Sequence, residues 1–214
     1  MYTQTLRNFR FSYTSPIHAQ NGRFTEGRWL HTVAVGNWTL LIEDGSLPKI
    51  YDHYVKNAAF VDQVKPSTPE GRDLFLGVCD GGRSHSWPEI VITQRYEDAS
   101  GTFHPGFLVV PENSILFIGA GERLLGYNVE RRERVFEDRT DYGFWGWTRQ
   151  EDYVLMSAEL EFGVWRKTGE KLWSTFVEPP WSFNISGGNV ELNIMGQVKT
   201  LRLETGAVAL TKVS

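Results

Sequence analysis

The stretch GVWRKTGEKLWSTF, residues 163–176, decides the fold. It consists of an apolar strand, a turn built on Thr168 and Gly169, and a second strand that carries Leu172 and Trp173. Glycine is typical of such turns because it adopts positive φ angles without a steric cost. The stretch therefore predicts a β-hairpin.

Two further segments align with this hairpin without gaps. GYNVERRERVF begins at residue 126 and TLRLETGAVAL at residue 200, so the starts are 37 residues apart (163 − 126 and 200 − 163). The alignment makes Tyr127, Val164 and Leu201 equivalent to one another, and Arg132 stands where the other two copies have glycine. The hairpin is therefore one copy of a repeated unit.

Each hairpin is preceded by another apolar stretch, namely SILFIGA, DYVLMSA or NVELNIM. Aromatic lead-in strands, GFWGW and PWSFNIS, come before the second and third copies. A unit of this length cannot bury its own apolar faces, so neighbouring units must stack against one another. We therefore expect a series of stacked antiparallel β-meanders.

This pattern resembles the blades of the pyrroloquinoline-quinone-like repeat β-propellers, in which a Thr-Gly turn leads to an aliphatic-Trp pair. Thr168, Gly169, Leu172 and Trp173 match that motif, whereas the third copy keeps only Thr-Gly and the first copy lacks it. The resemblance covers about residues 107–210, half of the chain. It implies propeller-like meanders, and no quinone-binding residue can be placed, so we expect no cofactor.

The first half of the chain alternates strand-like stretches with one helical pattern. Apolar residues from Ile50 to Val64 recur at helical spacing, which predicts a helix near residues 47–64. We expect a mainly all-β single domain, 1–214, shaped as a β-propeller of about five blades with this helix inserted. A β-sandwich with one helix is the alternative.

Composition and charge exclude several classes of protein. The chain has 26 acidic and 22 basic residues, a net charge of −4, which is unlike a nucleic-acid binder. The short basic run at Arg131, Arg132 and Arg134 is expected to be a solvated turn or a contact to an acidic group.

The one cysteine, Cys79, cannot form an internal disulfide. No apolar run is long enough to span a membrane, and we expect a soluble, cytoplasmic protein.

The loop GVCDGGRSHSW, residues 77–87, has the densest set of reactive side chains. A catalytic interpretation pairs Cys79 or a serine with His85 as the base, oriented by Asp80, with Arg83 and Trp87 beside them. Neighbours on one loop rarely adopt that geometry, and Asp-Gly-Gly is also a turn signature. A turn with a buried cysteine is therefore the competing interpretation. No histidine spacing matches a metal site.

The aromatic lead-in strands supply a second set of candidates. Trp145 and Trp147 lie two residues apart, and Trp181 has a corresponding place one unit later. Strand alternation predicts that Trp145 and Trp147 share one face of their sheet. Such rings either fill the space between sheets or line a binding surface.

Two hypotheses for function follow. The first is a non-enzymatic module whose rigid β scaffold binds a protein partner, for example an inhibitor- or immunity-like protein that neutralises a basic partner. The second is an enzyme or binder for a small ligand or carbohydrate, using the 79–87 loop and the lead-in aromatics.

Overall fold

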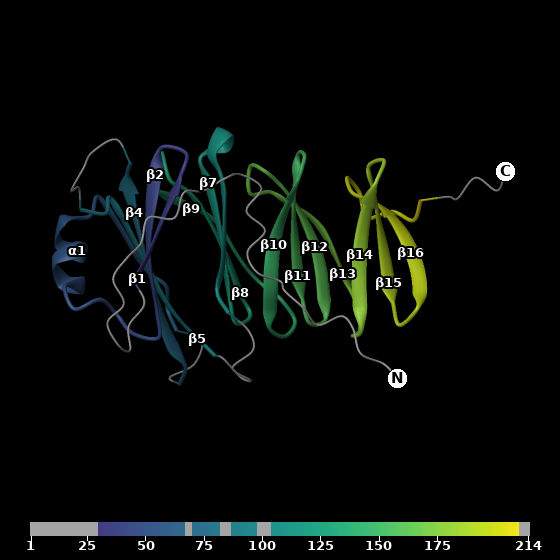
Figure 1. Cartoon of the computed structure of the whole chain (residues 1–214), viewed down its shortest axis with the longest axis horizontal. Coiled ribbons are helices and arrows are strands. Elements are labelled where there is room, and N and C mark those ends of the chain that lie inside the picture. The colour runs from purple at the N-terminus through teal and green to yellow at the C-terminus, as the bar shows by residue number, and fades with distance from the viewer. Residues whose placement is uncertain (1–29, 67–69, 82–86, 98–103, 210–214) are drawn as a thin grey trace.

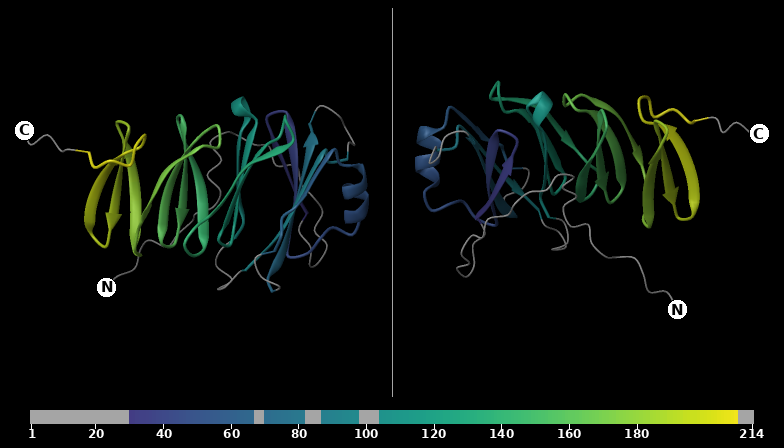
Figure 2. Two further views of the ribbon diagram at one scale, coloured as in Figure 1. Left: turned by 180° about the vertical axis from the view of Figure 1, so that it is seen from behind. Right: turned by 45° about the horizontal axis from the view of Figure 1, so that its top comes forward.

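The computed structural model describes residues 30–66, 70–81, 87–97 and 104–209, which form four β-sheets standing side by side in a row (Figure 1). Figure 2 shows the same row from behind and tilted. The expectation of a mainly β, propeller-like chain of stacked meanders with one helix is confirmed. Within the described residues, no helix is long and apolar enough to cross a membrane.

Sheet 1 holds five strands in the order β1-β2-β4-β5-β3, and only the β3–β5 pair is parallel. Its strands are β1 (Leu30–Val35), β2 (Trp38–Asp44), β3 (Phe60–Gln63), β4 (Arg72–Asp80) and β5 (Ile90–Tyr96). The helix α1 (Tyr51–Asn57) packs on the face that points away from the other sheets (Figure 1).

The predicted helix over 47–64 is too long, because the chain turns into a strand after α1. Phe60 N and Val64 N donate hydrogen bonds to backbone carbonyls at the edge of β5. The aromatic and β-branched residues of this segment suit a strand, and the open edge of β5 offers partners for their backbone groups. Pairing with that edge therefore prevails over the local helical spacing.

Sheets 2 and 3 are four-stranded meanders, and sheet 4 has three strands, each paired antiparallel with the next in sequence. Sheet 2 contains β6 (Gly106–Val110), β7 (Ile115–Ala120), β8 (Arg123–Asn128) and β9 (Glu133–Arg139), with the 3₁₀ turn η1 (Pro111–Asn113) after β6. Sheet 3 contains β10 (Phe144–Gln150), β11 (Tyr153–Ala158), β12 (Glu161–Arg166) and β13 (Lys171–Phe176). Sheet 4 contains β14 (Trp181–Ser186), β15 (Asn189–Ile194) and β16 (Gln197–Arg202).

The described residues form four sheets where the sequence predicts about five blades. The difference arises in the first half of the chain. Strands β1 and β2 do not form a unit of their own, because β2 pairs along its whole length with β4. All five N-terminal strands therefore merge into one sheet. Four sheets in a row also differ from the two facing sheets of the alternative sandwich.

The structural repeat is less regular than the gapless alignment implies. The third strands of sheets 2, 3 and 4 begin at Arg123, Glu161 and Gln197, each after a two-residue turn, so the spacings are 38 (161 − 123) and 36 (197 − 161) residues. The turn after the third strand restores the spacing of 37 residues in the strand that follows. It has three residues between the paired Arg166 and Glu170 in sheet 3, and four residues at the same place in sheets 2 and 4.

The gapless alignment therefore places Val164 one residue out of register. Tyr127 and Leu201 point toward the preceding sheet, and Trp165 is their equivalent in sheet 3, where it packs against sheet 2. Val164 lies on the opposite face and packs against sheet 4. The prediction that Val164 shares their position is wrong, although the tandem arrangement of like sheets stands.

Three apolar layers between the sheets, and a fourth under α1, form the core. Each of the first three layers draws buried aliphatic and aromatic side chains from the two sheets that enclose it, and the fourth draws them from α1 and sheet 1. Representative members are Leu76 and Leu116 between sheets 1 and 2, Phe144 and Trp165 between sheets 2 and 3, and Leu155 and Leu192 between sheets 3 and 4. Each sheet thus buries the apolar face of its neighbour, as expected for a stacked repeat.

The Thr-Gly turn has a packing role that links one sheet to the next. A Cβ at Gly206 would lie 2.8 Å from the ring of Trp173 in the preceding sheet, and the Trp173 Nε1 donates to Leu203 O at 2.7 Å. Gly169 similarly faces Val135 and Phe136 of β9, the last strand of sheet 2. Gly169 and Gly206 both have positive φ, at 92° and 67° respectively. The turn glycine of one sheet therefore makes room for the aromatic of the sheet before it.

The outer face of sheet 4 is polar. Alternation along its strands turns the apolar side chains toward sheet 3, and the outward positions are largely short or charged. They are Ser182, Asn184, Ser186, Asn189, Glu191, Asn193, Val198, Thr200 and Arg202. A polar last face is what allows a stacked repeat to end in water.

Candidate functional site

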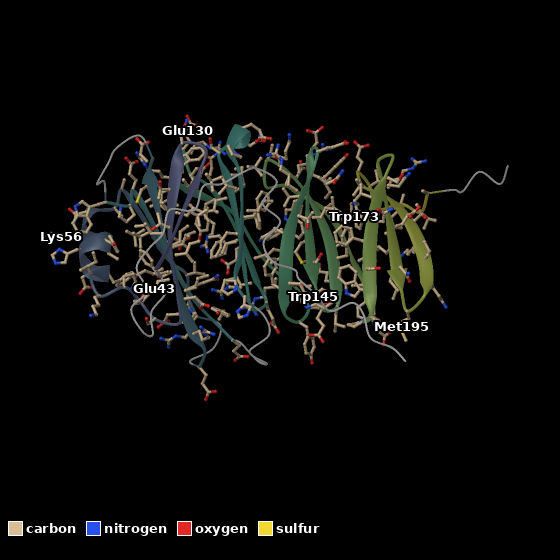
Figure 3. All side chains as sticks on the ribbon, in the orientation of Figure 1. Glu43, Lys56, Glu130, Trp145, Trp173 and Met195 are labelled. Atoms are coloured by element: carbon tan, nitrogen blue, oxygen red, sulfur yellow. The ribbon has the colours of Figure 1, made fainter. Side chains whose placement is uncertain are left out.

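The sheets present two rims, because successive turns of a meander alternate between its two ends. The upper rim in Figure 1 carries turns 129–132, 151–152 and 167–169, and the lower rim carries 121–122, 140–143, 159–160 and 195–196. In Figure 3, Glu130 lies on the upper rim, whereas Trp145 and Met195 lie on the lower rim.

The two groups of sequence-predicted site residues lie far apart on these rims. Asp80 ends β4 at the upper rim beside sheet 2, and Trp145 and Trp181 lie at the lower rim of sheets 3 and 4. Arg83 and His85 lie outside the described residues. The structure therefore contains two separate candidate regions rather than one combined site.

A pocket of about 400 Å³ opens at the upper rim between sheets 1 and 2. Arg132 bridges its two sides by donating to Glu89, and Ser114 Oγ donates to Glu130 at 3.2 Å. Its lining residues are Asn37, Trp38, Val78, Cys79, Asp80, Glu89, Ile90, Pro111, Ser114, Val129, Glu130 and Arg132. Arg132, which replaces the turn glycine of the later copies, thus serves as an inter-sheet contact.

Cys79 and Trp87 do not assemble a catalytic group with Asp80 in the described part of the loop. Burial, and secondly the charge of Glu89, raise the pKa of the Cys79 thiol, which disfavours the nucleophilic thiolate. Trp87 stacks on His53 and meets Tyr54 edge-on, so it covers α1 instead of facing sheet 2. The cysteine is buried, as the turn interpretation expects.

Trp147 is a core residue between sheets 2 and 3. Its ring packs within 5.4 Å, centroid to centroid, of Phe117, Phe144 and Trp165. The Trp147 Nε1 is buried and makes no hydrogen bond within the described structure. Its place is explained by packing.

Trp145 lies on the opposite face from Trp147, so the prediction of a shared face is wrong. A β-bulge between Phe144 and Gly146 makes Trp145 the extra, unpaired residue of β10. A one-residue bulge reverses the alternation that follows it. The Trp145 side chain, 42% exposed, stacks on Trp181 of sheet 4 with ring centroids 5.3 Å apart and planes 11° apart.

Two further exposed apolar residues, Tyr142 and Met195, lie in turns of the same rim, and we call Tyr142, Trp145, Trp181 and Met195 together the apolar rim. Tyr142 and Met195 are 63% and 62% exposed. The Trp181 Nε1 donates to Glu159 O at 3.1 Å, and Met195 N donates to the carbonyl next to Trp181 at 3.0 Å. The sequence does not mark Tyr142 and Met195 as site residues, because each is an isolated apolar residue in a turn and belongs to no apolar pattern. Both have positive φ, which sequence alone does not predict for these residue types.

A second pocket, the rim pocket, adjoins this surface between sheets 2 and 3. It has a volume of about 280 Å³ and is lined by Glu122, Thr140, Asp141, Tyr142 and Leu160. Thr140 is 3% exposed, and its Oγ1 has no hydrogen-bond partner among the described residues. No sequence pattern marks this pocket, since its residues come from three different turns.

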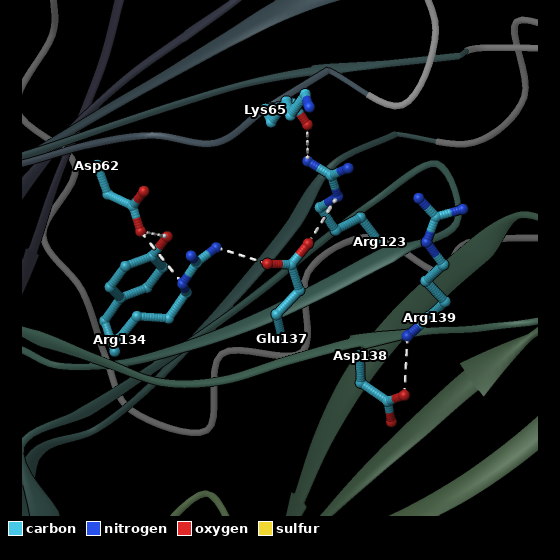
Figure 4. Close-up of polar contacts among 8 residues, drawn as sticks. Asp62, Lys65, Arg123, Arg134, Glu137, Asp138 and Arg139 are labelled. Atoms are coloured by element: carbon cyan, nitrogen blue, oxygen red, sulfur yellow. Dashed lines mark hydrogen bonds and ion pairs between the residues drawn. The ribbon is translucent and has the colours of Figure 1, made fainter.

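The basic run Arg131, Arg132 and Arg134 is engaged in ion pairs within the protein. Arg134 Nη1 donates to Glu137 at 2.7 Å, and its Nε lies 3.4 Å from Asp62 on β3 (Figure 4). Tyr127 OH donates to the same Asp62 carboxylate at 2.9 Å, and burial followed by that charge raises the pKa of Tyr127. Buried Arg123 donates to Lys65 O at 2.8 Å. These contacts fix sheet 1 to sheet 2.

In the described ranges, no cluster of three or more His, Cys, Asp or Glu side chains is arranged to hold a metal ion. No protein-family model matches the sequence, and no curated protein matches it either.

Several solved structures show a distant likeness to this chain at low sequence identity. BamB from Moraxella catarrhalis is 14% identical over 84% of this chain and 62% of its own, with a TM-score of 0.40. The computationally designed Ika8 protein is 11% identical over 84% and 59%, with a TM-score of 0.40. Kluyveromyces lactis Hsv2 is 10% identical over 50% and 35%, with a TM-score of 0.30. The chain spans less than two thirds of the length of each.

Proposed function

We propose that this chain is a protein-interaction module and that its partner binds on the apolar rim of sheets 3 and 4. The observation that carries the proposal is the bulge in β10. Without it, Trp145 would point into the layer that Trp147 fills; with it, the ring lies on the surface against Trp181. An exposed, pre-arranged aromatic pair is costly to keep in water and is typical of interface hot spots.

The rim is also prepared for binding. The Trp181 ring is held by its hydrogen bond to Glu159 O and by edge-on packing against Phe162. Trp145 is in turn held by stacking on that ring. Side chains that are already ordered lose little entropy when a partner arrives, so more of the contact energy appears as affinity.

Several finer features belong to the same proposal. The chain acts in the cytoplasm as an inhibitor- or immunity-like protein against a basic partner, which its net charge of −4 supports. Sheets 2 to 4 are pyrroloquinoline-quinone-like repeats; the contact between Trp173 and the Gly206 turn, which gives that motif a packing role, supports this assignment.

The test compares Trp145→Ala with Ile50→Ala, because these two side chains are similarly exposed at 42% and 43% and lie on different parts of the molecule. Trp145 lies where sheet 3 meets sheet 4, and Ile50 precedes α1 at the sheet 1 end of the row. The full chain captures its partner from an extract of the source cells, and the partner is then purified and titrated. Trp145→Ala should weaken affinity about tenfold or more, as truncation of a hot-spot residue does. Ile50→Ala should leave it unchanged.

Thermal unfolding followed by circular dichroism confirms that both variants are folded. Equal affinities for the wild type and a folded Trp145→Ala variant would refute the rim as the binding surface.

The upper-rim pocket supports a second candidate, a small-ligand site at Asp80. Its volume of about 400 Å³ falls within the range of about 300–1,000 Å³ that is typical of small-molecule sites. A ligand whose thermal stabilisation of the chain disappears in Asp80→Asn but persists in Trp145→Ala would support this candidate over the rim.

A further inference from the structure

Residues 1–29, the N-terminal segment, precede β1, lie outside the described residues and differ in charge from the rest of the chain. They contain four arginines and one acidic residue, a net charge of +3 (4 − 1), so residues 30–214 carry −7 (−4 − 3). Within the segment, Phe9, Phe11 and Tyr13 alternate with polar residues, which is the period of a strand with one apolar face. The N-terminal segment is therefore both basic and aromatic.

The N-terminal segment joins the fold on the side of the molecule that carries the apolar rim. The turn after β1 contains Asn37, which lines the upper-rim pocket, so Leu30 at the other end of β1 lies at the lower rim. Stacked sheets are about 10 Å apart, so the junction of sheets 3 and 4 lies about 25 Å along the row. The 16 residues from residue 14 to Leu30 (30 − 14) span about 50 Å when extended. Residues 7–14 can therefore reach the apolar rim.

The apolar rim matches this segment in chemistry. Tyr142 and Met195 are 63% and 62% exposed, and Trp145 is 42% exposed. Turns of the same rim also hold acids that form no ion pair within the described residues, namely Glu122, Asp141, Glu159 and Glu178. An exposed apolar surface with uncompensated acids around it favours a ligand that is both aromatic and basic.

Other surfaces of the row match the segment less well. On the upper rim, the acids at the junctions between sheets are already paired with lysine or arginine, as at Glu89, Glu112 and Glu204. The outer face of sheet 4 presents mostly serine, asparagine and other polar side chains, which offer aromatic rings little apolar contact.

We infer that residues 7–14 bind to the apolar rim of the same chain when no partner is present. Phe9, Phe11 and Tyr13 contact the exposed rings of the rim, and Arg7 and Arg10 pair with its acids. The segment thereby presents the basic and apolar chemistry expected of the partner.

The regulatory consequence of this contact rests on the proposed function. A partner that binds the same surface has to displace the N-terminal segment, so its apparent affinity is reduced by the fraction of molecules in which the rim is free. The segment then acts as a competitor within the chain, and it covers the Trp145 and Trp181 rings until the partner arrives.

The test is paramagnetic NMR on the full ¹⁵N-labelled chain, with a nitroxide attached to the cysteine introduced by Ser12→Cys. Ser12 belongs to the polar positions of the alternation, and Cys79 is buried, so the label attaches outside the fold. We expect the label to broaden the amide signals of Tyr142 and Trp145 and to leave that of Glu130, on the upper rim, sharp.

The aromatic contribution is tested by a matched pair of double variants. Phe9→Ser/Phe11→Ser should reduce the broadening of the Trp145 amide severalfold, because it removes the apolar side of the segment. Tyr2→Ser/Phe24→Ser, which removes two aromatic residues outside residues 7–14, should leave the broadening unchanged.

The contribution of charge is tested in the same way. Arg7→Gln/Arg10→Gln should reduce the broadening severalfold, and Arg23→Gln/Arg28→Gln, which removes the same charge closer to β1, should leave it unchanged.

Three results would overturn the inference. They are equal broadening of both rims, undiminished broadening in Phe9→Ser/Phe11→Ser, and broadening of a ¹⁵N chain by a label carried on a second, ¹⁴N chain. The last result would mean that the segment binds a second copy and not its own rim.

Affinity for the purified partner separates this inference from the proposed function. Tighter binding by Phe9→Ser/Phe11→Ser supports the competition, and unchanged binding overturns it. If the label broadens the rim but Trp145→Ala binds the partner as the wild type does, the contact of the segment stands and the rim falls as a partner site. If Trp145→Ala weakens partner binding and the label leaves the rim sharp, the proposed function stands and the contact of the segment falls.

Discussion

At the scale of single residues, an aromatic ring packs directly on two glycines that lie opposite each other on neighbouring strands. Gly106 and Gly119 are cross-strand neighbours in sheet 2, and the ring of Phe144 from sheet 3 lies directly on them. Cβ atoms at these two positions would come within 2.7 Å and 2.5 Å of that ring. The close approach of sheets 2 and 3 therefore depends on the absence of side chains at this pair.

Gly119→Ala is expected to lower the free energy of unfolding by about 1–3 kcal/mol, because the added methyl group forces Phe144 out of its seat. Gly146→Ala is the matched control, since a Cβ there would meet nothing within 4 Å. Urea denaturation of both variants measures the difference. Similar stabilities for the two variants would show that the layer between sheets 2 and 3 adapts freely.

The residues of the candidate sites show where sequence reasoning ends. Aromatic lead-in strands predicted large rings between sheets, and Trp147 is such a ring. The exposure of Trp145 could not be predicted, because a one-residue bulge leaves no mark in the pattern of apolar residues. The rim pocket was equally hidden, since Glu122, Thr140 and Leu160 meet only after three turns are stacked.

At the scale of elements, ion pairs on the upper rim join each sheet to the next. Arg132 pairs with Glu89 between sheets 1 and 2, Lys167 with Glu112 between sheets 2 and 3, and an Arg166–Glu204 contact spans sheets 3 and 4. Their side chains are between about one fifth and two thirds exposed, so each pair contributes little by itself. Their main effect is to fix the alignment of neighbouring turns.

Glu112 should make this junction sensitive to acid. Partial burial acts to raise the pKa of Glu112, but hydrogen bonds from its backbone and from Lys167, together with the charge of Arg149, outweigh it and hold the pKa below its usual range. A carboxylate with a lowered folded pKa stabilises the protein above its unfolded pKa of about 4.3, and that stability is lost as pH falls through the folded value.

We therefore expect the wild type to melt at a higher temperature than Glu112→Gln at pH 7, with the gap closing below about pH 4. Thermal unfolding at a series of pH values measures the gap. Glu151→Gln, in a neighbouring turn, is the control and should show no such trend. A gap that persists at low pH would mean that Glu112 does not act through its charge.

Between residues 107 and 210, the order of strands followed from the sequence because apolar alternation recurs in each unit. The exact register did not follow from the sequence. The turn after the third strand has three residues in sheet 3 and four in sheets 2 and 4. A gapless comparison averages over that difference and misplaces Val164. At residues 58–64 the apolar residues do recur at helical spacing. Local spacing contains no information about the edge of β5, with which this segment pairs.

At the scale of the whole molecule, the two end faces of the described row differ, since one is covered by a helix and the other is polar and exposed. α1 seals the outer face of sheet 1, with Tyr54 stacked on Phe75 at a centroid distance of 5.4 Å. Sheet 4 ends the row with its polar outer face. Closing the row into a ring would bring a helix against polar side chains, which buries little apolar area.

Making the outer face of sheet 4 apolar should cause self-association. In Glu191→Val/Asn193→Val, two substituted positions adjoin exposed Val198 and create an apolar patch that a second copy can cover. Analytical ultracentrifugation should show a larger, concentration-dependent sedimentation coefficient than that of the wild type. Glu191→Gln/Asn193→Asp keeps the face polar and should match the wild type; unchanged sedimentation of the valine variant would argue against the capping role.

The polar outer face of sheet 4 also limits how a protein of this kind can lengthen in evolution. A duplicated copy of sheet 3 inserted beside the original would meet apolar neighbours on both sides. The same copy appended after sheet 4 would press its apolar side against serines and asparagines and gain almost nothing. Gene duplication can therefore add a sheet between the existing ones more readily than beyond the polar outer face of sheet 4.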